Sequence, residues 1–278
     1  MKIVILDQKT LTNNDISFSE IEALGDVTAY DLTQPDDVIE RIGNAEIVLC
    51  NKSQMTEKIL TSCKNLKYIG LFATGYNNVD INVATKCNIT VTNAGEYSTL
   101  AVAQHVFALV LQFYSRINEY DVSVKNGNWI KSNTFSYFNY PTAEIAGLTI
   151  GIVGFGSIGR TVAKIAAAFG MKVIVSTRTI PEKVVFPYEF VSQNDLFSRA
   201  DIVTLHCPLT ADTEGLICKD NKEKMKNNAI LINTSRGGVV VEQDLADALN
   251  NGLIAGAGLD VISSEPMLPT NPLIGAKN

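Results

Sequence analysis

The sequence predicts an α/β protein with two domains, each built on a doubly wound parallel sheet, and three observations lead to this prediction. Short apolar runs alternate with helical patterns from one end of the chain to the other. Most of these runs are rich in Ile, Val and Leu with little polar alternation, which is typical of parallel strands covered on both faces. The alternation is interrupted once, after residue 98, and the break separates two βα series.

Each series contains five expected strands. They cover residues 2–6, 27–30, 46–50, 67–71 and 89–92, then 148–153, 172–176, 201–205, 229–233 and 254–259. Thr33-Gln34-Pro35 opens one intervening helix, with Pro near its first turn, and Gly43 ends it. Another helix is expected over residues 157–169, with Gly170 as its stop. Right-handed crossovers through such helices produce parallel sheets.

The interruption places the domain boundary near Ser98, giving domains over residues 1–98 and 99–278. A longer apolar helical pattern runs over residues 98–116. The following stretch, 119–142, lacks strong periodicity and contains the only tryptophan, Trp129, among Phe and Tyr residues. An aromatic segment of this kind is expected to cover a partner subunit, which predicts a homodimer.

Composition excludes several classes of partner. The net charge of −6 over 278 residues gives no basic footprint for nucleic acid or for an anionic membrane surface. No apolar run approaches the roughly 18 residues that a membrane span needs. The five cysteines are an odd number and are scattered, which favours reduced thiols and a cytoplasmic protein. Their spacing fits no metal site, so we expect no metal.

Residues 154–159, Gly-Phe-Gly-Ser-Ile-Gly, form a G-x-G-x-x-G motif between an expected strand and an expected helix, as in a dinucleotide-binding loop. Gly154 allows a tight turn, Gly156 lets the backbone approach a pyrophosphate, and Gly159 lets helix and strand pack closely. Ser157 and Ile158 begin the helix, whose first N–H groups face the phosphates. The alternative is an ordinary tight turn between a strand and a helix.

The end of the next strand is expected to select the cofactor. An acidic residue there would bind the ribose 2′-OH of NAD. The strand over 172–176 is instead followed by Thr177-Arg178-Thr179. Arg178 is suited to a 2′-phosphate, so the sequence favours NADP over NAD by a narrow margin. The alternative is that Arg178 is solvated and other contacts hold NAD.

Polar clusters follow three strands of the second series: residues 206–208, 234–238 and 260–266. Ligands of open α/β sheets bind beyond the carboxyl ends of the strands, so these clusters are expected to converge on the cofactor crevice. Arg236, flanked by small residues, suits a bidentate grip on a carboxylate. The alternative is a surface arginine in a glycine turn. In the first series, residues 73–77 also follow a strand.

These motifs, in this order, resemble the D-isomer-specific 2-hydroxyacid dehydrogenases over nearly the whole chain. The matching stretches are 73–80 (ATGYNNVD, similar to the family's substrate-carboxylate loop), 154–159, 201–210 (DIVTLHCPLT), 231–239 (LINTSRGGV) and 258–261 (GLDV) with Glu265-Pro266. The Ala-Thr-Gly-Tyr-Asn form of the first loop most resembles glycerate dehydrogenases, also called hydroxypyruvate reductases.

The resemblance implies a flavodoxin-like substrate domain over 1–98, a Rossmann-type NAD(P)-binding domain over 99–278, and a cleft between them that closes by hinge motion near Ser98. It implies that Arg236 binds the substrate carboxylate and carbonyl oxygen, and that the N–H groups of Thr74 and Gly75 hold the carboxylate's other side. Glu265 would raise the pKa of a catalytic histidine. The residues that the resemblance places at the cofactor are Cys207, Pro208, Thr213, Thr234, Ser235 and Asp260, the last beside the nicotinamide amide.

The catalytic histidine of the family has no counterpart here, because in the family it follows the glutamate at a greater distance than that from Glu265 to Asn278. Only two histidines are present. His206 lies in a cofactor signature stretch, and His105 is interpreted as a satisfied helix histidine. We therefore expect a truncated chain, which as it stands binds the nucleotide but catalyses poorly or not at all.

The implied activity is the reversible NAD(P)-linked reduction of a small 2-oxo acid, hydroxypyruvate or glyoxylate, to the D-2-hydroxy acid, glycerate or glycolate. Hydride moves from C4 of the nicotinamide to C2 of the 2-oxo acid, so a cation and a proton donor are needed where charge develops on oxygen. One alternative is a D-lactate-type dehydrogenase of the same family. Another is a non-catalytic, nucleotide-sensing protein similar to the family's corepressors.

Overall fold

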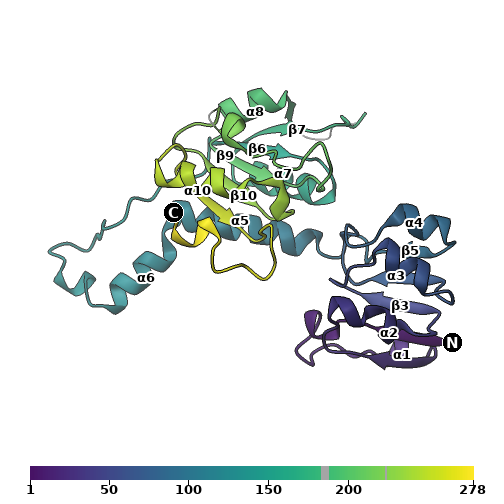
Figure 1. The fold of residues 1–278 in the computed structure, drawn as a ribbon. Helices are drawn as coiled ribbons and strands as arrows, with labels where there is room; N and C mark the ends of the chain where they lie inside the picture. The colour runs from purple at the N-terminus through teal and green to yellow at the C-terminus, as the bar shows by residue number, and fades with distance from the viewer. Residues whose placement is uncertain (183–187, 223) are drawn as a thin grey trace. The chain divides into compact units, whose positions relative to one another are not determined.

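The computed structural model describes residues 1–182, 188–222 and 224–278 (Figure 1). The chain divides into two compact units, Met1–Ser98 and Thr99–Asn278. These are the residue ranges expected from the sequence, and the substrate and cofactor roles assigned to them stay predictions.

Unit 1 is built on a five-stranded sheet in the order β2-β1-β3-β4-β5. Its strands are β1 Lys2–Ile5, β2 Asp26–Ala29, β3 Ile47–Cys50, β4 Tyr68–Leu71 and β5 Thr90–Thr92. Every neighbouring pair is parallel. This strand order is the flavodoxin-like one, with a topological switch point between β1 and β3. The predicted fold class of the first half is therefore confirmed.

Helices connect the strands of unit 1. They are α1 Ser19–Glu22, α2 Val38–Ile42, α3 Glu57–Ser62 and α4 Ile81–Lys86, with 3₁₀ turns at Gln8–Thr10 and Pro35–Asp37. The helix expected to open at Pro35 begins as one of these turns and continues as α2. Gly43 ends it with a φ of 52°, a left-handed conformation that glycine adopts without strain. The core of the unit is aliphatic, with Val48 and Ile69 from the central strands fully buried.

Unit 2 is built on a six-stranded parallel sheet in the order β11-β10-β9-β6-β7-β8. Its strands are β6 Thr149–Val153, β7 Lys172–Ser176, β8 Glu189–Phe190, β9 Ile202–Leu205, β10 Ile230–Asn233 and β11 Gly256–Leu259. Numbered within the unit and read from β8, the order is 3-2-1-4-5-6, that of dinucleotide-binding folds. The predicted class is again confirmed. Strand β8 was not expected, because two residues are too short to show periodicity.

Helices cover both faces of this sheet (Figure 1). Buried side chains of α5 Thr99–Ser115 and α7 Ser157–Ala168 belong to one apolar cluster. Those of α8 Gln193–Arg199 and α10 Glu242–Asn250 belong to another, on the second face. The shorter elements are α9 Lys219–Lys222 and 3₁₀ turns at Gly237–Val239 and Pro272–Gly275. Burial on both faces explains why the strands read as unbroken apolar runs.

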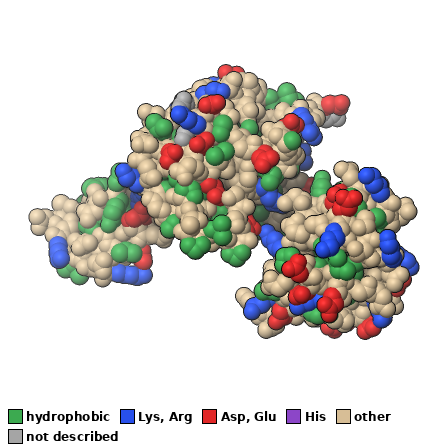
Figure 2. All heavy atoms as spheres, viewed as in Figure 1, with side chains coloured by type: hydrophobic (Ala, Val, Ile, Leu, Met, Phe, Trp, Pro, Cys, Tyr) green, Lys and Arg blue, Asp and Glu red, His purple; other side chains and the backbone are tan. Residues whose placement is uncertain are grey.

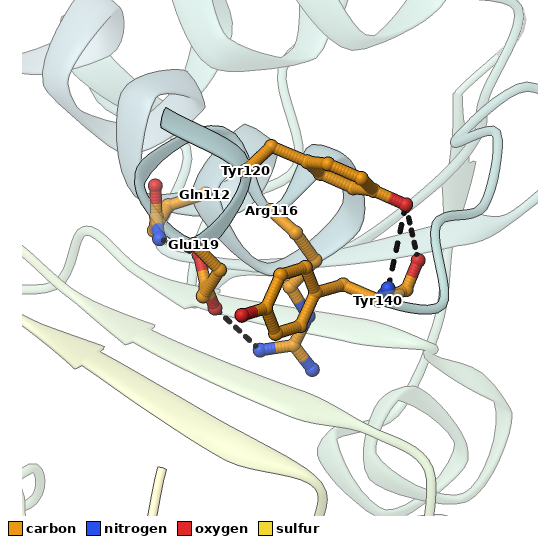
Figure 3. Close-up of polar contacts among 5 residues, drawn as sticks. All are labelled: Gln112, Arg116, Glu119, Tyr120 and Tyr140. Atoms are coloured by element: carbon orange, nitrogen blue, oxygen red, sulfur yellow. Dashed lines mark hydrogen bonds and ion pairs between the residues drawn. The ribbon is translucent and has the colours of Figure 1, made fainter. Parts of the chain in front are cut away.

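A further helix, α6 Ile117–Lys125, follows α5 at a bend of 56°, and a 3₁₀ turn forms at Trp129–Lys131. Helix α6 was not expected, because the sequence of this stretch lacks a strong apolar period. Arg116 at the bend is left-handed, with a φ of 52°. Glu119 accepts hydrogen bonds there from Gln112 Nε2 at 2.9 Å and from Arg116 Nη1 at 3.1 Å. The Tyr120 hydroxyl donates to the Tyr140 carbonyl at 2.8 Å (Figure 3). We call residues 117–142 the arm.

Among the described residues, no single helix has the length and apolar character to cross a membrane, although the bent pair α5 and α6 together meets that test by length and composition alone.

Candidate active site

The carboxyl ends of five strands in unit 2, β6, β7, β9, β10 and β11, lie along one edge of the sheet, and backbone hydrogen bonds join several neighbouring ends. The N–H of Gly154 donates to Ser176 O at 2.9 Å, and that of His206 donates to Val153 O at 2.7 Å. Further along the edge, the N–H of Asp260 donates to Asn233 O at 3.0 Å. The polar clusters expected to converge after β9, β10 and β11 therefore share one edge of the sheet with the glycine loop after β6.

The three glycines of the 154–159 loop have different environments. Gly154 has a φ of 91°, and a Cβ there would lie 2.7 Å from the carbonyl carbon and oxygen of His206. A Cβ on Gly159 would overlap the carbonyl oxygen of Gly154. Gly156 is exposed, and a Cβ on it would meet no atom within 4 Å. The first and third glycines thus allow close packing, whereas the second leaves an open approach to the backbone.

This loop leads into α7, a helix of 12 residues that begins at Ser157 with Gly156 as its N-cap. Its first N–H groups form an electropositive end next to the open face of Gly156, an arrangement that accepts phosphates. Thr234, which follows β10, has a buried hydroxyl with no hydrogen-bond partner in the described part of the chain. A buried polar group without a partner costs free energy that a ligand can recover. The residues present therefore fit a bound dinucleotide.

Arg236 is presented by a turn that Asn233 organises. The buried Asn233 amide donates from Nδ2 to Arg236 O at 3.0 Å, while its Oδ1 accepts from Ser235 N at 3.0 Å and Ser235 Oγ at 2.8 Å. Arg236 is half-buried, and its Nη1 donates to Ser235 O at 2.7 Å. From the sequence, Asn233 was expected only as the last residue of a strand. The Asn-Thr-Ser order, typical of a side chain that hydrogen-bonds its own turn, was the available signal.

The loop after β11 lies against this turn. A Cβ on Gly237 would overlap the carbonyl group of Ile262, so the two backbones are in close contact. Glu242 of α10 holds the same loop, because its Oε1 accepts from Ser263 N at 2.6 Å and its Oε2 from Asn271 Nδ2 at 2.9 Å. Asp260 and Glu265 on this loop are both exposed.

His105, interpreted from sequence as a satisfied helix histidine, has Asp260 as a partner. The distance from its Nε2 to Asp260 Oδ1 is 3.4 Å, and both side chains are about half exposed. The pair links α5 to the end of β11. His105 thus lies beside one of the residues that the sequence assigned to the cofactor.

The other residues assigned to the cofactor occupy three kinds of position. Cys207 is 8% exposed within an apolar cluster, and burial raises the pKa of its thiol, which keeps it protonated. Thr213 stabilises the loop after β9. Its hydroxyl donates to Pro208 O at 2.6 Å and accepts from Thr210 N at 2.8 Å. Ile158 and Thr177 are half-buried, and Arg178 is exposed just beyond β7.

His206, at the same edge of the sheet, has a pKa far from its ordinary value. It is mostly buried, and its Nε2 lies 2.9 Å from Thr204 Oγ1. Desolvation lowers the pKa of its imidazole to about 4, because burial disfavours the charged form. The ring is therefore neutral at pH 7.

In unit 1, Thr74 and Gly75 lie on the loop after β4. The Thr74 hydroxyl donates to Gly95 O at 2.9 Å, and its carbonyl accepts from Asn93 Nδ2 at 2.7 Å. Within the described residues, neither backbone N–H of this pair donates a hydrogen bond to the protein. Such amides are available for an anion. No group of His, Cys, Asp and Glu suited to a metal ion occurs among the described residues.

The family model for the NAD-binding domain of D-isomer-specific 2-hydroxyacid dehydrogenases matches residues 107–278. The chain belongs to this family. A hydroxypyruvate reductase of Blautia hydrogenotrophica is 42% identical over all of this chain and 88% of its own length. A glycerate dehydrogenase of Methylorubrum extorquens is 40% identical over 99% of this chain and 85% of its own length. An acyclic imino acid reductase solved with NADPH and D-Arg has a TM-score of 0.87 and 33% identity, covering 99% of this chain and 87% of that one.

The family resemblance predicted from the motifs is confirmed, including its likeness to glycerate dehydrogenases and hydroxypyruvate reductases. This 2-hydroxyacid dehydrogenase is an oxidoreductase that transfers hydride between a nicotinamide cofactor, NAD or NADP, and a 2-hydroxy or 2-oxo acid. The predicted enzyme class and cofactor class are thereby confirmed.

Proposed function

We propose that this dehydrogenase reduces hydroxypyruvate or glyoxylate to D-glycerate or glycolate. The observation that carries the proposal is the placement of Arg236, a half-buried cation, on a turn at the same sheet edge as the glycine loop. The Ala-Thr-Gly-Tyr-Asn loop at 73–77 and the names of the two curated relatives support this choice of substrate. In this proposal unit 2 binds the cofactor and contributes Arg236 to substrate binding, and unit 1 contributes the other contacts to the substrate.

Each site residue then has a physical role. A bound nicotinamide supplies or accepts the hydride. Arg236 binds the substrate carboxylate and stabilises the negative charge that develops on the carbonyl oxygen. The N–H groups of Thr74 and Gly75, which donate to no protein group among the described residues, also bind the carboxylate. Glu265 stabilises a positively charged proton donor placed beside it. The open face of Gly156 and the start of α7 receive the pyrophosphate.

For the cofactor, the proposal favours NADP over NAD. Arg178 is exposed directly beyond β7, and Thr177-Arg178-Thr179 contains no acid that would bind the 2′-OH of NAD and repel a 2′-phosphate. The structural relative with NADPH bound supports a cofactor of this type.

We also propose a homodimer in which the arm contacts a second copy of the chain. The root of the arm is fixed by the contacts at Glu119 and Tyr120. Beyond it, Ile130 is 89%, Phe135 91% and Phe138 87% exposed, and Figure 2 shows apolar and charged side chains mixed along this region. An apolar surface on a fixed support is typical of a subunit interface. The molar mass in solution, from light scattering, distinguishes dimer from monomer.

The negative net charge and the five free cysteines support a cytoplasmic enzyme that binds no nucleic acid.

The test of the catalytic proposal is Arg236→Ala in the full-length enzyme. We expect kcat/KM for hydroxypyruvate to fall by about 10³-fold or more while the Kd for NAD(P)H stays within about twofold. Arg199→Ala, which removes an exposed arginine of α8 that pairs with Glu189 of β8, is the matched control and is expected to keep the wild-type kcat/KM. Unchanged turnover in Arg236→Ala would remove Arg236 from the site. If the wild type binds the cofactor but turns over no 2-oxo acid, the result supports the nucleotide-sensing alternative. If the wild type prefers pyruvate to hydroxypyruvate, the result supports the D-lactate dehydrogenase alternative.

A further inference from the structure

The carboxylate of Asp7 is the centre of a buried polar network in unit 1. Asp7 follows β1 and is 3% exposed. Its Oδ1 accepts from Asn51 N at 2.8 Å. Its Oδ2 accepts from Lys52 N at 2.8 Å, Ser53 N at 2.8 Å and Ser53 Oγ at 2.9 Å. Three successive backbone amides after β3 thus converge on one side chain from β1.

A carboxylate is the side chain best suited to this position. It presents only acceptors, and charge-assisted hydrogen bonds are stronger than neutral ones. Because the three amides point at one place, any donor introduced there would face another donor. The conformation of residues 51–53 therefore depends on the negative charge of Asp7 and not only on its volume.

The same segment is tied on its other side to the loop after β4. Asn78, also buried, donates from Nδ2 to Ser53 O at 2.9 Å, with a longer contact to Asn51 O at 3.4 Å. Asn78 O accepts from Met55 N at 2.7 Å, and Asp80 N donates to Met55 O at 3.1 Å. Residues 51–55 are thus held between Asp7 and the loop that carries Thr74 and Gly75.

We propose that Asp7 is a positioning residue for substrate binding: its charge fixes residues 51–53, and these, through Asn78, fix the loop whose Thr74 and Gly75 amides hold the substrate carboxylate. The inference rests on the proposed function, because it assumes that these two amides bind the acid. Asp7 itself contacts neither substrate nor cofactor. Its effect is expected on the affinity for the 2-oxo acid and not on the cofactor bound by unit 2.

The test is Asp7→Asn in the full-length enzyme, which keeps the shape of the side chain but replaces one acceptor oxygen with a donor. We expect the KM for hydroxypyruvate to rise by about tenfold, with kcat and the Kd for NADPH within about twofold of wild type. Ser53→Ala removes only one of the four donors and is expected to raise KM by about two- to threefold. It also provides a test if Asp7→Asn does not fold.

The matched control is Val48→Ala, which removes buried methyl groups from β3 in the same unit without touching the network. Its KM is expected to stay at the wild-type value when it is folded, even though its melting temperature falls. A rise in KM for the two network variants alone supports positioning. An unchanged KM in Asp7→Asn and Ser53→Ala, or an equal rise in Val48→Ala, overturns it. If the wild-type enzyme turns over no 2-oxo acid, the proposed function is overturned as well. If the wild type is active and the Arg236→Ala variant is not, the proposed function stands whatever the result for Asp7.

Discussion

The loops at the carboxyl ends of the strands are positioned by different means in the two units. In unit 1, the buried side chains of Asp7 and Asn78 hydrogen-bond to backbone groups of neighbouring loops. In unit 2, the side chains of Asn233 and Glu242 make such hydrogen bonds too, but the loops there also depend on Gly154, Gly159 and Gly237, which let backbone segments lie so close together that a side chain would overlap them. Both arrangements place backbone amides where an anion can reach them.

The difference shows that the two units tolerate change differently. A loop held by a polar side chain depends on charge and on the direction of each hydrogen bond. A loop held by glycine depends on the absence of atoms, so an added methyl group acts through steric overlap and must move the backbone. Substitution of Asp7 is expected to change affinity first, whereas substitutions of Gly154, Gly159 and Gly237 are expected to change stability first.

The largest expected effect is that of Gly159→Ala. Its new Cβ overlaps the carbonyl oxygen of Gly154, a backbone atom that cannot move without opening the loop. We expect a loss of about 3 kcal/mol or more in the free energy of unfolding, measured by urea denaturation. Gly156→Ala is the matched control, because its Cβ meets nothing within 4 Å. It should lose at most about 1 kcal/mol of stability yet bind NAD(P)H at least about tenfold more weakly. Equal losses of stability would contradict the contrast between the glycines.

The second effect is on the stability of the folded protein at acidic pH. The folded-state pKa of His206 is about 4, against 6.5 for an ordinary histidine. Between pH 6.5 and pH 4, the imidazole is therefore protonated in the unfolded chain but neutral in the folded one. Stability contributed by the neutral ring is present above pH 6.5 and is lost as the pH falls towards 4. The full loss corresponds to about 3 kcal/mol. His206→Asn should reduce the difference between unfolding free energies at pH 7 and pH 4.5. An unchanged pH dependence in the variant would show that the ring is not desolvated.

The smallest of these three effects is that of Arg178→Ala. An exposed cation beyond β7 that meets a 2′-phosphate should contribute about 1.4 kcal/mol, or tenfold in affinity. We therefore expect the Kd for NADPH to rise by about tenfold and that for NADH to stay nearly constant, both measured by fluorescence titration. Equal weakening of the two cofactors would refute the 2′-phosphate role.

Much of the architecture could be predicted because the signals are local. The apolar runs at 148–153 and 201–205 correspond to the buried strands β6 and β9, and Gly170 ends α7 with a φ of 75°. The elements that were not predicted are short or weakly periodic, namely β8 and α6. The convergence of strand-end clusters followed from the rule for parallel sheets, since all their carboxyl ends lie on one edge.

The organising side chains were harder to find. Asp7 lies just beyond β1 and Asn78 lies in the loop after β4, and nothing in the local pattern separates these two polar residues from ordinary loop residues. Their importance comes from partners far away in the sequence, as in the contacts from Asp7 to residues 51–53, which are 44 to 46 positions away. The partner of His105, Asp260, likewise comes from a distant strand end.

The sequence by itself determined the α/β class, the two-part division of the chain, the glycine loop and the dehydrogenase family, because periodicity, glycine spacing and motif order are properties of neighbouring residues. Only the tertiary structure decided which polar groups are buried together, how the two sets of loops are held, and that burial keeps His206 neutral. These properties depend on desolvation and on hydrogen bonds between distant segments, which exist only once the strands are side by side.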